Sequence, residues 1–74
     1  MKVKVFGLLK KYTDNKDVIE IEVDSEKRVG DIIGSLNIPE SYVYIIEKNG
    51  NPVKKDTVVN NDDRIALIPL LSGG

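Results

Sequence analysis

The sequence predicts a small α+β domain whose elements follow one another in the order β-β-α-β-β-β. A chain of 74 residues with 41% hydrophobic side chains is long enough for one core and too short for a second domain. Apolar residues recur at every second position near the N-terminus and at every third or fourth position in the middle of the chain. The Asn49-Gly50 dipeptide further along is the strongest hairpin signal in the sequence.

Two strands are expected at the N-terminus. In Lys2 to Phe6 and again in Asp17 to Asp24, apolar residues alternate with charged ones, as in a strand with one buried face. Leu8 to Lys16 lies between them as a polar, Lys-rich connection. The outward charges of the two segments are opposite in sign and indicate an antiparallel hairpin with cross-strand ion pairs: Lys2 and Lys4 against Glu20 and Glu22.

The period then changes to that of a helix. Four apolar residues at positions i, i+3, i+4 and i+7 predict a short helix that buries one face on the sheet: Val29, Ile32, Ile33 and Leu36. Arg28 is a poor N-terminal cap, which allows the helix to begin nearer Ser25. Asn37 is suited to the left-handed position that ends a helix. Gly34, inside the helix, is expected to mark a close approach to the sheet.

The C-terminal half is expected to supply three more strands. Tyr42 to Lys48 is rich in β-branched and aromatic residues, and Asn49-Gly50 turns it into a brief strand around Val53. Pro52 restricts that brief strand to an edge of the sheet. Ile65 to Ile68 is the last strand, and its unbroken apolar run is typical of a central position.

A polar excursion from Lys54 to Asp63 precedes the last strand. Its adjacent acids, Asp62 and Asp63, are interpreted as solvated turn residues rather than as a catalytic or metal-binding pair. The sequence therefore predicts a domain over residues 1–68 and a flexible C-terminal tail over residues 69–74 that ends in Gly-Gly.

Composition excludes several classes of function. The chain has no Cys and no His, which removes disulfides, zinc sites, thiol nucleophiles and a Ser-His-Asp triad, and no metal site is expected. A net charge of −1 argues against nucleic-acid binding. The sequence contains neither a membrane-spanning stretch nor a signal peptide. We therefore expect a cytoplasmic protein that is monomeric when free and has no membrane or nucleic-acid partner.

The terminal Gly73-Gly74 pair is the one feature that the fold does not require. Joined to a β-β-α-β-β-β domain of this size, it makes the sequence resemble the ubiquitin-like sulfur carriers of the MoaD/ThiS family, which include the small subunit of molybdopterin synthase. The resemblance covers the whole chain and depends on five segments: Val3-Lys4-Val5-Phe6, Val29-Gly30-Asp31-Ile32-Ile33, Lys48-Asn49-Gly50, Asp63-Arg64-Ile65 and the tail from Pro69 to Gly74. One departure is Asn61-Asp62-Asp63, where the family usually has Asp-Gly-Asp.

The resemblance implies a ubiquitin-like β-grasp fold, a mixed sheet with one main helix, in which the first and last strands run parallel at the centre. It also implies a reaction. An E1-like enzyme, using ATP and Mg²⁺, adenylates the carboxylate of Gly74, and sulfur then replaces the adenylate to give a thiocarboxylate. That sulfur passes to an accepting enzyme such as the large subunit of molybdopterin synthase. The chain itself would be a carrier without a bound cofactor, not an enzyme.

The residues of the tail suit this chemistry. A terminal carboxylate is ionised at neutral pH and resists nucleophiles until it is activated. Gly73 and Gly74 lack a Cβ, so the backbone can pass through a narrow channel. The preceding residues expected to thread the same channel carry no side-chain charge: Pro69, Leu70, Leu71 and Ser72.

A docking surface is also expected. Strand parity places Phe6, Ala66 and Ile68 on the side of the sheet away from the helix, where polar residues are usual. An apolar patch there, next to the tail, indicates a partner-binding surface. The alternative is that the connection from Leu8 to Lys16 folds over these side chains.

Four functions are compatible with the sequence. The segment Phe6-Gly7-Leu8-Leu9 and the proline before the tail favour a carrier for molybdenum or tungsten cofactor synthesis over a thiamine-pathway carrier. A protein modifier joined to lysines through Gly74 would have the same tail, because both functions need an activated carboxylate. The fourth is an interaction module whose tail has no chemical role.

Overall fold

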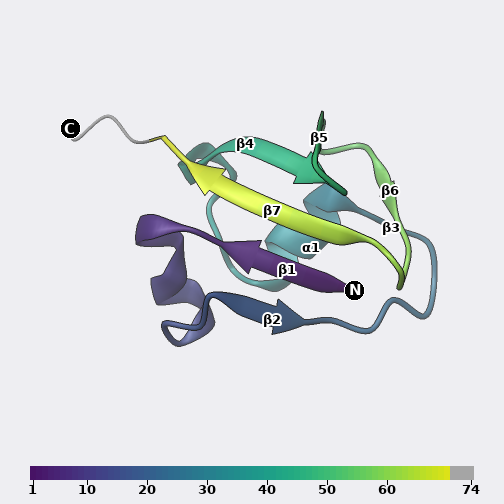
Figure 1. Ribbon diagram of the computed structural model, residues 1–74, viewed down its shortest axis with the longest axis horizontal. Coiled ribbons are helices and arrows are strands. Elements are labelled where there is room, and N and C mark those ends of the chain that lie inside the picture. Colours follow the sequence, from purple (N-terminus) through teal and green to yellow (C-terminus); the bar gives the residue numbers. More distant parts are fainter. Residues whose placement is uncertain (71–74) are drawn as a thin grey trace.

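The computed structural model describes residues 1–70 and shows a five-stranded mixed sheet with helices on one side (Figure 1). The strand order is β2-β1-β7-β4-β5, and two shorter strands, β3 and β6, pair with each other separately. Along the chain the elements are β1 (Lys2–Val5), η1 (Gly7–Thr13), β2 (Val18–Glu20), β3 (Lys27–Arg28), α1 (Val29–Ser35), η2 (Glu40–Tyr42), β4 (Val43–Lys48), β5 (Asn51–Val53), β6 (Val58–Val59) and β7 (Arg64–Pro69), where η denotes a 3₁₀ helix.

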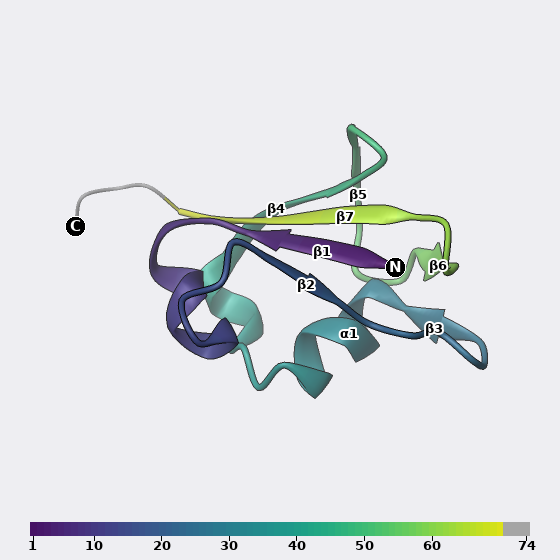
Figure 2. The ribbon, with the colours of Figure 1, turned by 60° about the horizontal axis from the view of Figure 1, so that its bottom comes forward.

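The expected β-grasp topology is confirmed. β1 runs parallel to β7, with Val3 beside Ile65 and Val5 beside Leu67, and β2 and β4 are antiparallel to their neighbours. β7 therefore lies at the centre of the sheet between β1 and β4. Figure 2 shows the sheet edge-on, with α1 and the coiled segments that precede and follow it on the same side.

The core lies between the sheet and these helices. Alternate residues of β1 and β7 point into it, and the helix adds the face that its spacing predicts. Its fully buried members include Val3, Val5, Leu9, Val29, Ile33, Ile65 and Leu67.

Helix α1 begins at Val29, and the backbone N–H groups around its start are hydrogen-bonded. The N–H of Arg28 donates to the Asp31 carboxylate at 2.9 Å, and the N–H groups of Val29 and Gly30 donate to carbonyls of the 55–57 segment, each at 2.9 Å. The Asp31 side chain and these two carbonyls together cap the start of the helix, which therefore does not extend back toward Ser25. Asn37 has the expected positive φ of 60°.

Two local expectations are wrong, and one further element was not expected. The connection after β1 contains the 3₁₀ helix η1. The strand predicted to reach Asp24 ends at Glu20, so Glu22 lies outside the ladder, and Lys2 lies opposite Glu20 without an ion pair between them. A Cβ on Gly34 would meet nothing within 4 Å, so this glycine does not mark a close approach to the sheet.

The boundary between domain and tail also differs from the expected one. Pro69 is the last residue of β7, pairs with Val43 and is fully buried. The sheet therefore includes Pro69, and Leu70 is the first residue beyond it. Within the described part of the chain, no helix is long and apolar enough to cross a membrane.

Candidate functional site

The end of β7 is anchored where the chain leaves the sheet. Gly7 turns the chain after β1 with a φ of +54°, a conformation that favours glycine. A Cβ at this position would lie only 3.3 Å from the Cγ of Pro69. Gly7 thus allows the buried Pro69 ring to pack against the turn. We call Pro69 and Leu70 the tail root.

Beyond the tail root, the tail residues predicted to carry the chemistry lie outside the described residues: Leu71, Ser72, Gly73 and Gly74. Leu70 itself is exposed and lines a hollow between η1 and η2 with Leu8 and Tyr42. The Nζ of Lys11 lies 5.9 Å from the centroid of the Tyr42 ring at this hollow. The surroundings of the tail root are therefore mainly apolar, with one cation.

The three residues predicted to bind a partner share one face of the sheet, as expected. We call the side turned away from α1 the outer face. Ala66 and Ile68 alternate along β7 with the buried Ile65 and Leu67, so both point to the outer face. Phe6 continues β1 with an extended backbone and lies alongside Ile68, because the register pairs the preceding Val5 with Leu67.

The connection after β1 does not cover this face. Its 3₁₀ helix lies on the same side of the sheet as α1 (Figure 2), and Leu9 of that helix is fully buried in the core. The alternative in which residues 8–16 fold over Phe6, Ala66 and Ile68 is therefore wrong. All three side chains are half-buried by their neighbours in the sheet.

Sequence reasoning missed several exposed apolar residues near the tail root. Ile45 lies opposite Ile68 and extends the row begun by Phe6 across three strands. Tyr44 is 65% exposed at an irregularity where the pairing of β4 shifts between Val43 and Ile45. Residues 43–46 are all apolar, so no alternation shows which of them face the core. The shift in pairing between Val43 and Ile45 also changes which face of the sheet successive residues occupy. Only the tyrosine, which is amphipathic, signalled exposure.

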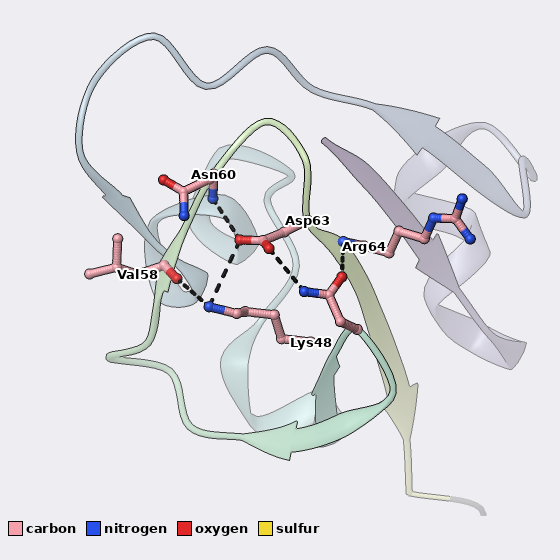
Figure 3. A network of polar contacts seen from close by, with 6 residues as sticks. Lys48, Val58, Asn60, Asp63 and Arg64 are labelled. Atoms are coloured by element: carbon pink, nitrogen blue, oxygen red, sulfur yellow. Dashed lines mark hydrogen bonds and ion pairs between the residues drawn. The ribbon is translucent and has the colours of Figure 1, made fainter.

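A polar network holds the opposite end of β7 (Figure 3). The Asp63 carboxylate is buried and accepts hydrogen bonds from the Asn49 side-chain amide at 3.0 Å and the Asn60 N–H at 2.8 Å. Lys48 lies 3.9 Å from the same carboxylate and donates to the carbonyl of Val58 at 3.2 Å. Asp63 is thus a structural residue and not the solvated turn acid expected.

Burial raises the pKa of Asp63, but its other contacts outweigh burial. The hydrogen bonds from Asn49 and the Asn60 N–H, together with the positive charges of Lys48 and the N-terminus, lower the pKa below its usual value. Asp63 therefore stays ionised and keeps the hairpin after β4 joined to the start of β7.

The most prominent surface feature of the described residues is a group of exposed apolar side chains. Among residues 1–70, no group of three or more acidic side chains is placed to hold a metal ion. Of the seven exposed large apolar side chains in residues 1–70, Val18 and Val58 lie elsewhere, and five lie at the end of the sheet from which the tail leaves: Leu8, Tyr42, Tyr44, Ile45 and Leu70. Such an arrangement suits a protein that presents its tail to a larger partner.

Comparison with known proteins agrees with the fold described above. The sequence model of the ThiS family matches residues 3–74. The crystal structure of SAMP1 from Haloferax volcanii is 25% identical, with a TM-score of 0.75 over 100% of this chain and 98% of the other. A protein provisionally assigned as molybdopterin converting factor, subunit 1, from Pyrococcus furiosus is 26% identical, with a TM-score of 0.71 over 92% and 93% of the two chains.

A thiamine biosynthesis protein from Geobacter metallireducens has the same fold, with 17% identity and a TM-score of 0.57 over 100% of this chain and 88% of the other. No curated protein sequence matches the chain. The fold defines a ubiquitin-like protein of the β-grasp class. The family match makes it a small carrier that is not itself an enzyme. The chain belongs to the ThiS family of MoaD/ThiS-like sulfur carriers. Membership implies an E1-like activating enzyme and a sulfur-accepting subunit as partners.

Proposed function

We propose that this chain carries sulfur as a thiocarboxylate on Gly74 for molybdenum or tungsten cofactor synthesis. The observation that carries the proposal is the placement of the tail root beside the apolar row of Phe6, Ile68 and Ile45, at one end of the sheet. A partner that binds this surface receives the tail at the same time. Residues Leu70 to Gly74, beyond the sheet, have no charged side chain, which suits passage through an apolar channel.

The chemistry belongs to the partner, and the chain supplies the group on which it acts. A carboxylate oxygen of Gly74 attacks the α-phosphorus of ATP, and pyrophosphate leaves. A sulfur nucleophile then attacks the carbonyl carbon, and AMP leaves with the oxygen. The activating enzyme binds ATP and Mg²⁺, so the carrier needs no cofactor of its own. The thiocarboxylate finally passes its sulfur to an accepting enzyme such as the large subunit of molybdopterin synthase.

Two features favour the molybdopterin pathway over the thiamine pathway. The Pyrococcus protein assigned as a molybdopterin converting factor subunit is 26% identical, whereas the thiamine biosynthesis protein is 17% identical and shows only the fold. The segment Phe6-Gly7-Leu8-Leu9 and the proline before the tail are the two features of the sequence that resemble the molybdopterin branch. In the structure they are in contact, because Gly7 packs against Pro69.

Protein modification is the second candidate function. SAMP1 of Haloferax volcanii matches this chain over its whole length. A second matching structure, also from Haloferax volcanii, is described as small archaeal modifier protein 1. In that function a lysine amine of a target attacks the carbonyl carbon of the adenylated Gly74, AMP leaves, and an amide forms. The two functions share activation and differ only in the nucleophile.

Intact mass spectrometry of the full chain distinguishes these outcomes. The purified protein is incubated with ATP, Mg²⁺ and a sulfide donor in a lysate of the source organism, then recovered and weighed. We expect the mass gain that corresponds to replacement of one oxygen by sulfur, and no gain without ATP. A ladder of larger conjugates would support the modifier, and an unchanged mass would indicate an interaction module without tail chemistry.

A further inference from the structure

We infer that the outer face recognises an acidic surface on the activating enzyme, through a basic hollow beside the apolar row. This inference rests on the proposed function and names the chemistry of the partner. The hollow lies on β1 and β7, toward the end of the sheet opposite the tail root. Its lining includes Lys2, Lys4, Arg64, Ala66, Val18 and Glu47.

The charge of the hollow is opposite to that of the whole protein. Three cations line it against the single carboxylate of Glu47, whereas the chain as a whole has a net charge of −1. Glu20 lies opposite Lys2 in the β1–β2 register but forms no ion pair with it. The lining of the hollow is therefore more basic than the chain as a whole, although eight of the eleven Lys and Arg residues lie elsewhere.

Within residues 1–70 these cations form no ion pair at 4 Å or less, although Lys4 is near enough to Asp17 to help Lys10 lower the pKa of that carboxyl. The ion pairs of this part of the chain use other residues, and no hydrogen bond is made by the side chain of Lys2, Lys4 or Arg64. The Nζ of Lys4 lies 5.1 Å from the centroid of the Phe6 ring, which joins the basic hollow to the apolar row. Exposed cations around an apolar centre favour a partner with a matching apolar ridge and acidic neighbours.

The activating enzyme is the occupant that the proposed chemistry requires first. The Gly74 carboxylate is unreactive until it is adenylated, both in sulfur transfer and in protein modification. Whichever acceptor follows, this enzyme must therefore hold the domain while the tail reaches its active site. Acidic residues on it would speed the encounter and orient the sheet, and salt would weaken both effects.

Adenylation kinetics with charge-reversed variants test the inference. We compare the wild type with Lys2→Glu/Lys4→Glu and with the charge-matched control Lys16→Glu/Lys54→Glu, whose side chains are exposed and do not line the hollow. The assay uses the purified E1-like enzyme of the source organism at about 0.05 and about 0.5 M salt. Thermal unfolding confirms that each variant is folded.

We expect the Lys2/Lys4 variant to raise KM by about tenfold or more at low salt, with kcat unchanged, because docking and not chemistry is lost. The control should change KM less than about twofold, and high salt should bring the wild type close to the Lys2/Lys4 variant. Equal KM for the two variants would overturn the acidic partner while leaving the carrier function intact. A wild-type chain that is not adenylated would overturn both the acidic partner and the carrier function. If the wild type binds a single-stranded RNA probe and the Lys2/Lys4 variant does not, the hollow is a nucleic-acid site and the inference is overturned.

Discussion

At the scale of single residues, Asp63 shows how one buried carboxylate joins distant segments. Its hydrogen bonds reach the hairpin after β4 and the turn after β6, and Lys48 contributes a further charge. Asn49 also accepts a hydrogen bond from the N–H of Arg64 at 2.9 Å, so the start of β7 is held from both sides. The start of β7 is thereby fixed in place, and the tail follows the opposite end of the same strand.

The lowered pKa of Asp63 predicts acid sensitivity. A carboxyl whose pKa is lower in the folded state stabilises the fold above its unfolded pKa of about 3.9, and this contribution is lost as pH falls through the folded value. The free energy of unfolding should therefore decrease in this window for the wild type, and decrease less for Asp63→Asn. Urea unfolding at a series of pH values measures the difference.

Neutral-pH stability supplies the control for Asp63. Asp63→Ala leaves buried donors unpaired and should cost about 1–3 kcal/mol, whereas Asp62→Ala at the exposed neighbouring position should stay within about 0.5 kcal/mol. Equal effects at the two positions would show that the network does not stabilise the fold.

Gly7 and Gly34 form a matched pair at the same scale. Gly7→Ala should destabilise the protein by about 1–2 kcal/mol, because an alanine is strained at a φ of +54° and its Cβ would crowd Pro69. Gly34→Ala should instead stabilise it by about 0.5–1 kcal/mol, because the helical position is open. Thermal unfolding of both variants gives the signs, and a stabilising Gly7→Ala would contradict the anchored tail root.

At the scale of elements, the 3₁₀ helix η1 connects the core to the surface around the tail. Its Leu9 is fully buried, while the adjacent Leu8 is 51% exposed and lines the hollow at the tail root. Lys10 of the same helix pairs with Asp17 at 2.6 Å and ties the helix to the start of β2. The 3₁₀ helix η1 thus places Leu9 in the core and Leu8 on the surface beside the tail root.

The two leucines predict separable effects. Leu9→Ala should lower the free energy of unfolding by about 2–5 kcal/mol, because it opens a cavity in the core. Leu8→Ala should leave stability nearly unchanged and weaken binding to the activating enzyme. Chemical denaturation and calorimetric titration of both variants separate the two, and a large loss of stability in Leu8→Ala would show that this residue packs in the fold.

The elements also show what the sequence could and could not predict. Long periodic segments were correct in type: the strands β1, β4 and β7, the helix α1 and the hairpin at Asn49-Gly50, both of whose residues have positive φ. The two-residue strands β3 and β6 pair only because tertiary packing brings them together, and two residues carry no period. The boundary between domain and tail was misplaced by one residue because proline usually ends a strand, whereas here Pro69 is part of β7 and packs against Gly7.

The candidate site was predictable to the same degree. The alternation of β7 placed Ala66 and Ile68 on the outer face, and the structure agrees. Ile45 could not be assigned to a face because the pairing of β4 shifts next to it. The unpaired cations of β1 were expected to pair with Glu20 and Glu22, and the early end of β2 is the reason that Glu22 does not face them.

At the scale of the whole molecule, the sheet has one covered face and one open face. The covered face supplies stability, and the open face and the tail root lie where a partner can reach both (Figures 1 and 2). Substitutions on the two faces should therefore affect different measurements.

Phe6→Ala and Ile68→Asp should each weaken binding to the activating enzyme at least about tenfold, about 1.4 kcal/mol, because anchors near the centre of an interface dominate its affinity. Val3→Ala on the covered face should instead lower stability, since Val3 is fully buried. Calorimetric affinity and thermal unfolding are measured for all three variants. If Phe6→Ala unfolds the domain as Val3→Ala does, the assignment of the outer face is wrong.

The central claim is that the carboxylate of Gly74 is the group on which the partner acts. ATP–pyrophosphate exchange with the purified activating enzyme tests it most directly, using the wild type, a chain lacking Gly74 and the length-preserving control Ser72→Ala. We predict exchange with the wild type and the control, and none with the shortened chain, while all three unfold at the same temperature. Undiminished exchange by the chain that lacks Gly74 would contradict the account.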